Sequence, residues 1–208
     1  TQAAAVNVFS GAATGTVESG QTVKGLTFTV GGLADGANER IVVDGTAISL
    51  GGDSSGVTAT NAMSYAVTIA GGTATVVLTS VPGVATADIN TLVNGITYQN
   101  TSTDNPTAGN RVFTLTQVQD SGGTANGGVD AATLSIASTV TVGAVNDAPI
   151  LATGSTLTYT ENSTTPINTA ITVSDADNVT LSTATVAITG GFVSGEDVLD
   201  FTNVPATM

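Results

Sequence analysis

Apolar and polar residues alternate along several short stretches of the chain, which is the pattern of half-buried β-strands. The clearest stretch runs from residue 23 to residue 30. A β-bulge at Gly25 would place its large side chains on one face: Val23, Leu26, Phe28 and Val30. Shorter or longer strands of the same kind are predicted at Val6–Phe9, Gly15–Val17, Ile41–Val43, Ile48–Leu50, Ile96–Gln99, Arg111–Asp120 and Ala132–Val142.

A β-hairpin is predicted where two alternating stretches flank a pair of glycines. Ala66–Ala70 and Thr73–Thr79 are separated only by Gly71 and Gly72. A two-residue loop of the primed type needs positive φ angles, which glycine adopts without steric cost. These residues therefore predict two antiparallel neighbours in one sheet.

Thr86–Gly95 is the only helical candidate, with room for one or two turns. Thr86 is expected to cap the helix and Gly95 to end it. A period close to 3.6 would turn three apolar side chains inward: Ile89, Leu92 and Val93.

Many short strands separated by glycine turns favour an all-β fold, and in particular a β-sandwich. An up-and-down barrel is the alternative. Aromatic residues make up only 4% of the chain and Trp is absent, so Val, Ile, Leu and Ala must fill the core. Such a core suits thin layers of sheet.

Two units are predicted, joined by a short connector, Asn146-Asp147-Ala148-Pro149. Pro149 has no N–H and biases Ala148 toward an extended conformation, so this segment cannot continue a central strand. We expect a first unit over residues 1–145 and the beginning of a second over residues 150–208. The two units match at three places: Val17–Gly20 with Thr160–Ser163, Thr27–Val30 with Ala170–Val173, and Glu39–Val42 with Glu196–Leu199.

The second unit corresponds only to the first part of the preceding one. Half a sandwich would leave an apolar sheet face and strand edges without partners, and both are costly in water. Two explanations follow. Either the chain is a piece of a longer protein, or a neighbouring copy completes the unit by strand addition, which would build filaments or a surface layer.

Charge excludes several classes of function. The chain has three basic residues, Lys24, Arg40 and Arg111, and sixteen acidic ones, which gives a net charge of −13. Nucleic acid and anionic membrane are therefore not expected partners, and no apolar run is long enough for a membrane span. The chain has no His and no Cys, which removes the usual nucleophilic triads. We expect a protein that is not an enzyme and whose natural counter-charge is a divalent cation.

Oxygen-bearing side chains gather at the connector and shortly after it. Asn146 and Asp147 belong to the connector, and Asp175 and Asp177 follow the strand predicted at Ala170–Val173. Ca²⁺ takes six to eight oxygen ligands, so these side chains predict a calcium site at the junction. The alternative is that Asp175 and Asp177 cap a turn, as Asp often does.

Several motifs, in this order, resemble those of a cadherin repeat. Arg111–Gly123, Ser138–Val142 and Val145–Pro149 resemble its last two strands and linker. Glu161-Asn162 is similar to the cadherin Glu-Asn element, and Asp175-Ala176-Asp177 is similar to its Asp-Ala-Asp calcium motif. The chain as a whole is most similar to the cadherin-like repeats of very large bacterial surface proteins and RTX-type adhesins.

The resemblance implies an immunoglobulin-like sandwich for each unit and Ca²⁺ where units meet. By position, the junction ligands would be Glu18, Asn146, Asp147, Asp175 and Asp177, while Glu161 would serve the next junction. It also implies an extracellular tandem-repeat protein with a role in cell adhesion, in which this chain is a structural extension module and neighbouring repeats are its partners. A self-assembling filament or surface-layer subunit is the alternative.

Overall fold

The computed structural model describes residues 4–16, 18–152 and 154–200. The chain divides into two compact units, Thr1–Val145 (unit 1) and Asn146–Met208 (unit 2). Each unit is described by itself.

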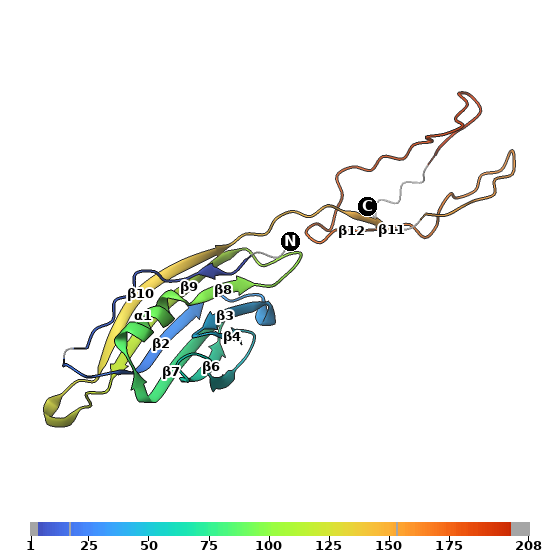
Figure 1. The fold of residues 1–208 in the computed structure, drawn as a ribbon. Coiled ribbons are helices and arrows are strands. Elements are labelled where there is room, and N and C mark those ends of the chain that lie inside the picture. The colour runs from blue at the N-terminus through green and yellow to red at the C-terminus, as the bar shows by residue number, and fades with distance from the viewer. Residues whose placement is uncertain (1–3, 17, 153, 201–208) are drawn as a thin grey trace. The chain divides into compact units, whose positions relative to one another are not determined.

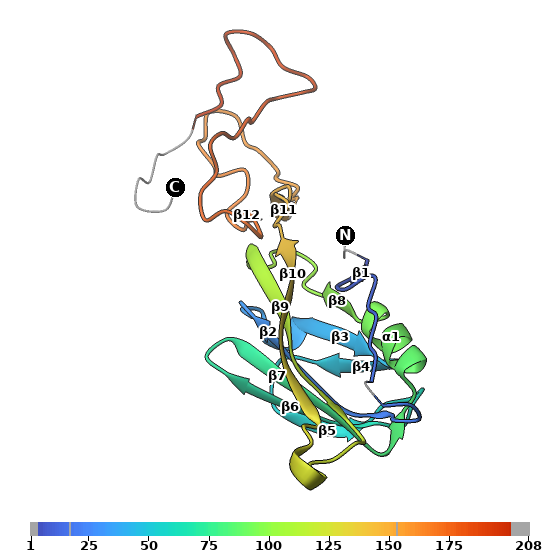
Figure 2. The ribbon, with the colours of Figure 1, turned by 90° about the vertical axis from the view of Figure 1, so that its left-hand side faces the viewer.

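Unit 1 is an all-β structure of two antiparallel sheets around one core (Figures 1 and 2). One sheet has the order β1-β8-β3-β4 and the other β10-β9-β2-β7-β6-β5. The first sheet consists of β1 (Val6–Asn7), β8 (Thr97–Asn100), β3 (Glu39–Val43) and β4 (Thr46–Ser49). The second consists of β10 (Ala131–Val142), β9 (Gly109–Asp120), β2 (Val23–Gly31), β7 (Thr73–Val84), β6 (Ser64–Ala70) and β5 (Ser54–Val57). This arrangement favours the sandwich over the barrel.

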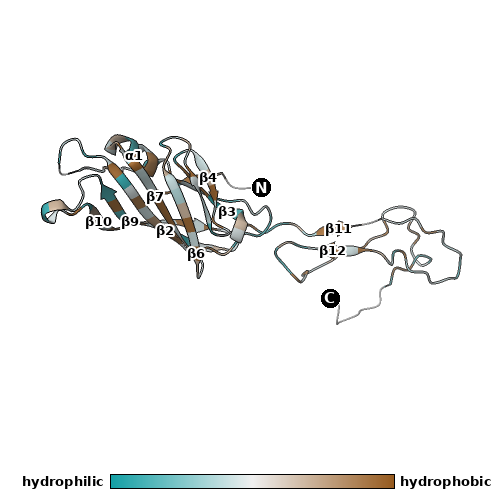
Figure 3. Ribbon diagram, turned by 90° about the horizontal axis from the view of Figure 1, so that it is seen from below, coloured by the Kyte–Doolittle hydropathy of each residue, from teal (hydrophilic) through white to brown (hydrophobic). Residues whose placement is uncertain are grey.

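The predicted face of β2 is confirmed. The register of β2 shifts between Val23 and Gly25 against both β7 and β9, which is the irregularity of a β-bulge. All four predicted side chains are buried: Val23, Leu26, Phe28 and Val30. Figure 3 shows hydrophobic and hydrophilic residues alternating along the strands of this sheet. The alternation therefore orients β2 as expected.

The predicted hairpin is also confirmed, as β6 and β7. Gly71 and Gly72 have φ angles of 55° and 72°. Both values lie in the left-handed region, which the primed turn requires. Local turn chemistry thus sets the pairing of these two strands.

The predicted helix forms as α1 (Thr86–Asn94), with Ile89, Leu92 and Val93 buried as expected. The expectation that Thr86 caps it is wrong. Ala85 takes the N-cap position with an extended backbone, and its carbonyl accepts the N–H groups of Asp88 and Ile89. The helix therefore begins one residue earlier than the sequence suggested.

The strand predicted at Gly15–Val17 is wrong for residues 15 and 16, and residue 17 lies outside the described residues. The segment before it is held by side chains of α1 instead of by a sheet. The backbone N–H of Ala12 donates to the side-chain oxygen of Asn94 at 2.9 Å, and that of Thr14 donates to Asn90 at 2.6 Å. The side-chain amides of α1 therefore provide the hydrogen bonds that a neighbouring strand would otherwise make.

The start of β1 and the end of β10 lie at one pole of the sandwich. β1 begins with Val6 opposite Tyr98 and runs antiparallel to β8, away from the end of β8 at Asn100, and β10 ends with Val142 opposite Gly109, at the start of β9. The loop 101–108 joins β8 to β9 at this same end. We call this end, with loops 32–38 and 101–108, the connector pole, because the chain leaves it toward Asn146.

A tight backbone approach at the connector pole gives a testable prediction. Gly32 has φ of +83°, and a Cβ there would overlap the Asn110 carbonyl oxygen. Gly71 has φ of +55°, and a Cβ there would meet no atom within 4 Å. Gly71→Ala should therefore cost only the left-handed strain, about 1–2 kcal/mol, and Gly32→Ala should cost more because backbone must also move. Denaturant unfolding of both variants measures this; equal losses would contradict the clash.

Unit 2 contains little regular structure. β11 (Ile150–Ala152) pairs antiparallel with β12 (Thr172–Ser174). Its large apolar side chains within residues 150–152 and 154–200 are exposed, including Ile150, Leu151, Val186 and Phe192. The expected match with unit 1 is only partly seen, because Glu196–Leu199 lies outside any strand whereas Glu39–Val43 forms β3. The described part of unit 2 offers no second sheet for such a strand to pack on.

Candidate metal site

The loop Asp175–Asn178 is bonded to the connector within unit 2. The backbone N–H of Asp147 donates to the Asp177 carboxylate at 2.5 Å. The side-chain N–H of Asn178 donates to the side-chain oxygen of Asn146 at 3.1 Å. These two bonds hold the loop after β12 beside the segment that precedes β11.

The Asp175 carboxylate organises the loop itself. One of its oxygens accepts the backbone N–H groups of Asp177, at 2.9 Å, and Asn178, at 2.8 Å. These backbone hydrogen bonds lower the pKa of Asp175 below its ordinary value, because they stabilise the ionised form. The geometry is that of an Asx turn, which is the turn-capping role considered from the sequence.

Four of the five residues predicted as ligands lie in unit 2 and are linked by this loop: Asn146, Asp147, Asp175 and Asp177. The fifth, Glu18, lies in a turn of unit 1, where its carbonyl accepts the Thr16 hydroxyl at 3.2 Å. Among the residues that the structure describes, no three Asp, Glu, His or Cys side chains form a group able to hold a metal ion.

The chemistry of the loop nevertheless suits a hard cation. Asp175 and Asp177 each use one carboxylate oxygen in the hydrogen bonds above, which leaves the other oxygen of each. The sequence from Asn146 onward has no Lys or Arg, and its charged residues are all acids: Asp147, Glu161, Asp175, Asp177, Glu196, Asp197 and Asp200. A counter-charge for this unit must come from outside it.

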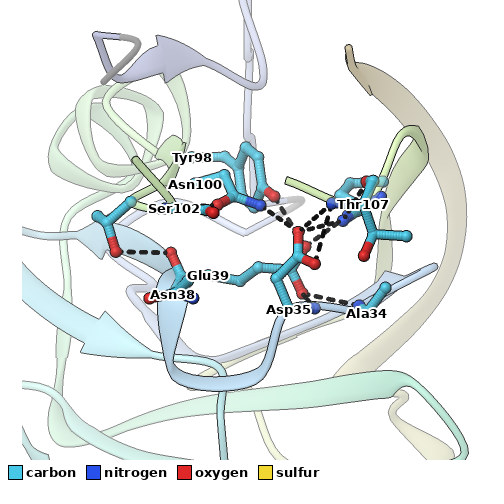
Figure 4. A network of polar contacts seen from close by, with 10 residues as sticks. Ala34, Asp35, Asn38, Glu39, Tyr98, Asn100, Ser102 and Thr107 are labelled. Carbon is cyan, nitrogen blue, oxygen red and sulfur yellow. Dashed lines mark hydrogen bonds and ion pairs between the residues drawn. The ribbon is translucent and has the colours of Figure 1, made fainter. Parts of the chain in front are cut away.

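A second polar group lies buried at the connector pole (Figure 4). Glu39 is fully buried and Arg111 is 1% exposed. One Glu39 oxygen accepts the Arg111 Nε–H at 2.5 Å and the Tyr98 hydroxyl at 2.8 Å. The other accepts the backbone N–H groups of Ala34 and Asp35. Each oxygen of the Glu39 carboxylate therefore accepts two hydrogen bonds, which compensate for the loss of water on burial.

Asp35 completes this buried network. Its carboxylate pairs with Arg111 at 3.1 Å and accepts the Asn100 amide and the Thr107 backbone N–H. Burial by itself raises the pKa of Asp35, but the bonds from Thr107 and Asn100 and the charge of Arg111 bring that pKa below its ordinary value. Burial and the bond to Glu39 raise the pKa of Tyr98. The network joins β3, β8 and β9 to both loops of the connector pole.

Sequence reasoning missed this network, although a signal for it exists. Arg111 has the same strand parity as Phe113 and Leu115, which point into the core. Glu39 likewise has the parity of Ile41 and Val43. Strand parity therefore places both charged side chains among core positions, where each needs a buried partner, although parity does not pair them with each other.

A scan against protein-family models, a search of curated proteins and a search of solved structures each found no match to this chain. Among the described residues, neither α1 nor the two 3₁₀ helices, η1 (Gly36–Asn38) and η2 (Ala125–Gly127), has the length and apolar character that a membrane-spanning helix needs.

Proposed function

We propose that this chain is a structural module of a multi-unit extracellular surface protein or adhesin, with cadherin-like units and a Ca²⁺-stiffened connector. The observation that carries the proposal is the bond from the Asp147 backbone to Asp177, which holds the acidic loop against the connector. A cation at this loop would fix the course of the chain between Val145 and β11.

The electrostatics of unit 2 support a cation as its counter-charge. Asp147, Asp175 and Asp177 repel one another, and the unit has no basic side chain to offset them. Asn146, Asp147, Asp175 and Asp177 would be the ligands within this unit, with backbone carbonyls and water filling the remaining positions. The ion would neutralise the carboxylates and bind the loop to the connector. Glu18, in unit 1, would be the further ligand implied by the cadherin resemblance.

Calcium titration of the full chain tests the proposal. Asp177→Asn keeps an oxygen that can accept the Asp147 N–H but removes the charge. We expect the wild-type chain to bind Ca²⁺ saturably in isothermal titration calorimetry, and Asp177→Asn to bind more than about tenfold more weakly. Glu196→Gln is the matched control, because it removes one acid of unit 2 that is not among the predicted ligands, and it should leave affinity unchanged.

Two results would contradict the proposal. The first is absence of saturable Ca²⁺ binding by the wild-type chain, which would leave Asp175 and Asp177 as turn residues only. The second is an equal loss of affinity in Asp177→Asn and Glu196→Gln, which would indicate diffuse attraction to an acidic surface. Small-angle scattering adds a functional readout: chelation should increase the radius of gyration if the ion restrains the connector.

A further inference from the structure

The strand β10 presents an open edge on unit 1. It is the last strand of its sheet and, in the part of the chain that the structure describes, it pairs with β9 alone. Its register is continuous from Ile136, opposite Leu115, to Val142, opposite Gly109. Among the residues with a described placement, one side-chain bond, from the Ser138 hydroxyl to the Val8 carbonyl, links it to the N-terminal segment. The outer backbone groups of a long edge strand are a template for another strand.

The usual protection of such an edge is missing here. Natural edge strands carry charged residues or proline that prevent pairing with other chains. The sequence from Ala131 to Asn146 contains neither a charged residue nor proline. The one irregularity, a register shift between Thr133 and Ile136, leaves the following part of β10 regular.

Unit 2 contains a segment that has the composition of a strand but forms none. Thr183–Thr189 alternates between a row of Ala184, Val186 and Ile188 and a row rich in Thr. β-Branched residues of this kind favour strands. In the structure the segment lies outside every strand, and Val186 is 73% exposed. Its backbone and its apolar row therefore lack a sheet.

Charge favours the association of these two elements over other contacts between copies. At a net charge of −13, most surfaces of two copies repel each other. The sequence from Val179 to Gly195 is uncharged, as is Ala131–Asn146. Apposing these stretches brings no carboxylates together. The apolar row of Thr183–Thr189 would also extend the half-buried row of Val140 and Val142 on β10.

We propose that Thr183–Thr189 of one copy adds as a strand to the outer edge of Ile136–Val142 in a second copy. The interaction is β-strand addition, in which main-chain hydrogen bonds provide affinity and alternate side chains provide register. Because each copy carries both an edge and a donor segment, the contact can propagate from copy to copy. It does not depend on Ca²⁺.

Light scattering coupled to size-exclusion chromatography of the full chain, in chelator, tests this. We expect a mass above that of one chain that rises with protein concentration. Val186→Pro/Ala187→Pro should abolish association, because successive N–H groups of a strand point to opposite sides and this variant removes whichever faces β10. Thr164→Pro/Thr165→Pro, in an exposed segment of unit 2 outside any strand, is the control and should still associate.

Cross-linking places the contact, because the chain has no cysteine of its own. Mixing Thr139→Cys copies with Ala187→Cys copies should give more mixed disulfide than mixing Thr139→Cys with Thr164→Cys. A monomer at every concentration would overturn the proposal, as would association that survives the double proline. An intrachain disulfide in Thr139→Cys/Ala187→Cys at low concentration would also overturn it, because Thr183–Thr189 would then pair with β10 of its own chain.

Discussion

Arg111→Met is expected to lower the free energy of unfolding of unit 1 by about 3–5 kcal/mol, since it leaves a buried carboxylate without its cation. Glu39 is fully buried, and Asp35 on the other side of the guanidinium is nearly so. Methionine fills much of the volume of arginine but donates no hydrogen bond. The loss is therefore the cost of an unpaired buried charge and not of a cavity. Denaturant unfolding of the full chain, followed by circular dichroism, measures it.

Arg40→Met is the matched control, because Arg40 lies next to Glu39 in β3 but is exposed. It should change the unfolding free energy by no more than about 0.5 kcal/mol. Combining Arg111→Met with Glu39→Leu removes the charge that Arg111→Met leaves unpaired and should recover part of the loss, because the backbone N–H groups of Ala34 and Asp35 and the Tyr98 hydroxyl then lose their acceptor. A loss in Arg111→Met no larger than that in Arg40→Met would show that the buried pair contributes nothing to stability.

Phe28→Ala is expected to cost about 3–5 kcal/mol, the range for deleting a buried aromatic ring. Phe28 has no exposed surface and lies in β2, which pairs with both β7 and β9 inside the larger sheet. Strands on both sides limit how far the backbone can move to close the cavity. The same unfolding experiment measures the effect.

Phe192→Ala provides the control for Phe28→Ala within the same chain. Phe192 belongs to unit 2 and is 55% exposed. Its removal should leave the unfolding of unit 1 unchanged. Similar effects of the two substitutions would contradict the assignment of one ring to the core and the other to the surface.

The parts of the fold that the sequence predicted are those determined by neighbouring residues. β2 was predicted with its bulge because Gly25 and the apolar residues around it lie within a few positions of one another. The Gly71-Gly72 turn is equally local. In contrast β5 was missed, because Ser54–Val57 has little strand character of its own and forms by pairing with β6.

The two polar sites differ in how much of them could be read from the sequence. Asn146, Asp147, Asp175 and Asp177 were singled out because they cluster at the connector and shortly after it, and the structure links these four, though not Glu18, by hydrogen bonds in one unit; calcium binding by them stays a prediction. The pairing of Glu39 with Arg111 joins residues far apart in the chain, so no local pattern displays it. Strand parity places both in the core, but β3 and β9 belong to different sheets, so only the packing of the two sheets brings these residues together.

The shared pole at which β1 begins and β10 ends decides how unit 1 would respond to tension. A pull on the two ends acts at the same side of the sandwich and therefore opens its ladders one pair at a time instead of shearing them together. β1 is joined to β8 by only two residue pairs, so it would peel away before any other strand. Loss of β1 would expose Val8 and Phe9, which lie in the core, to solvent. Under load, unit 1 would thus yield from its first strand while the Arg111 network still held the loops.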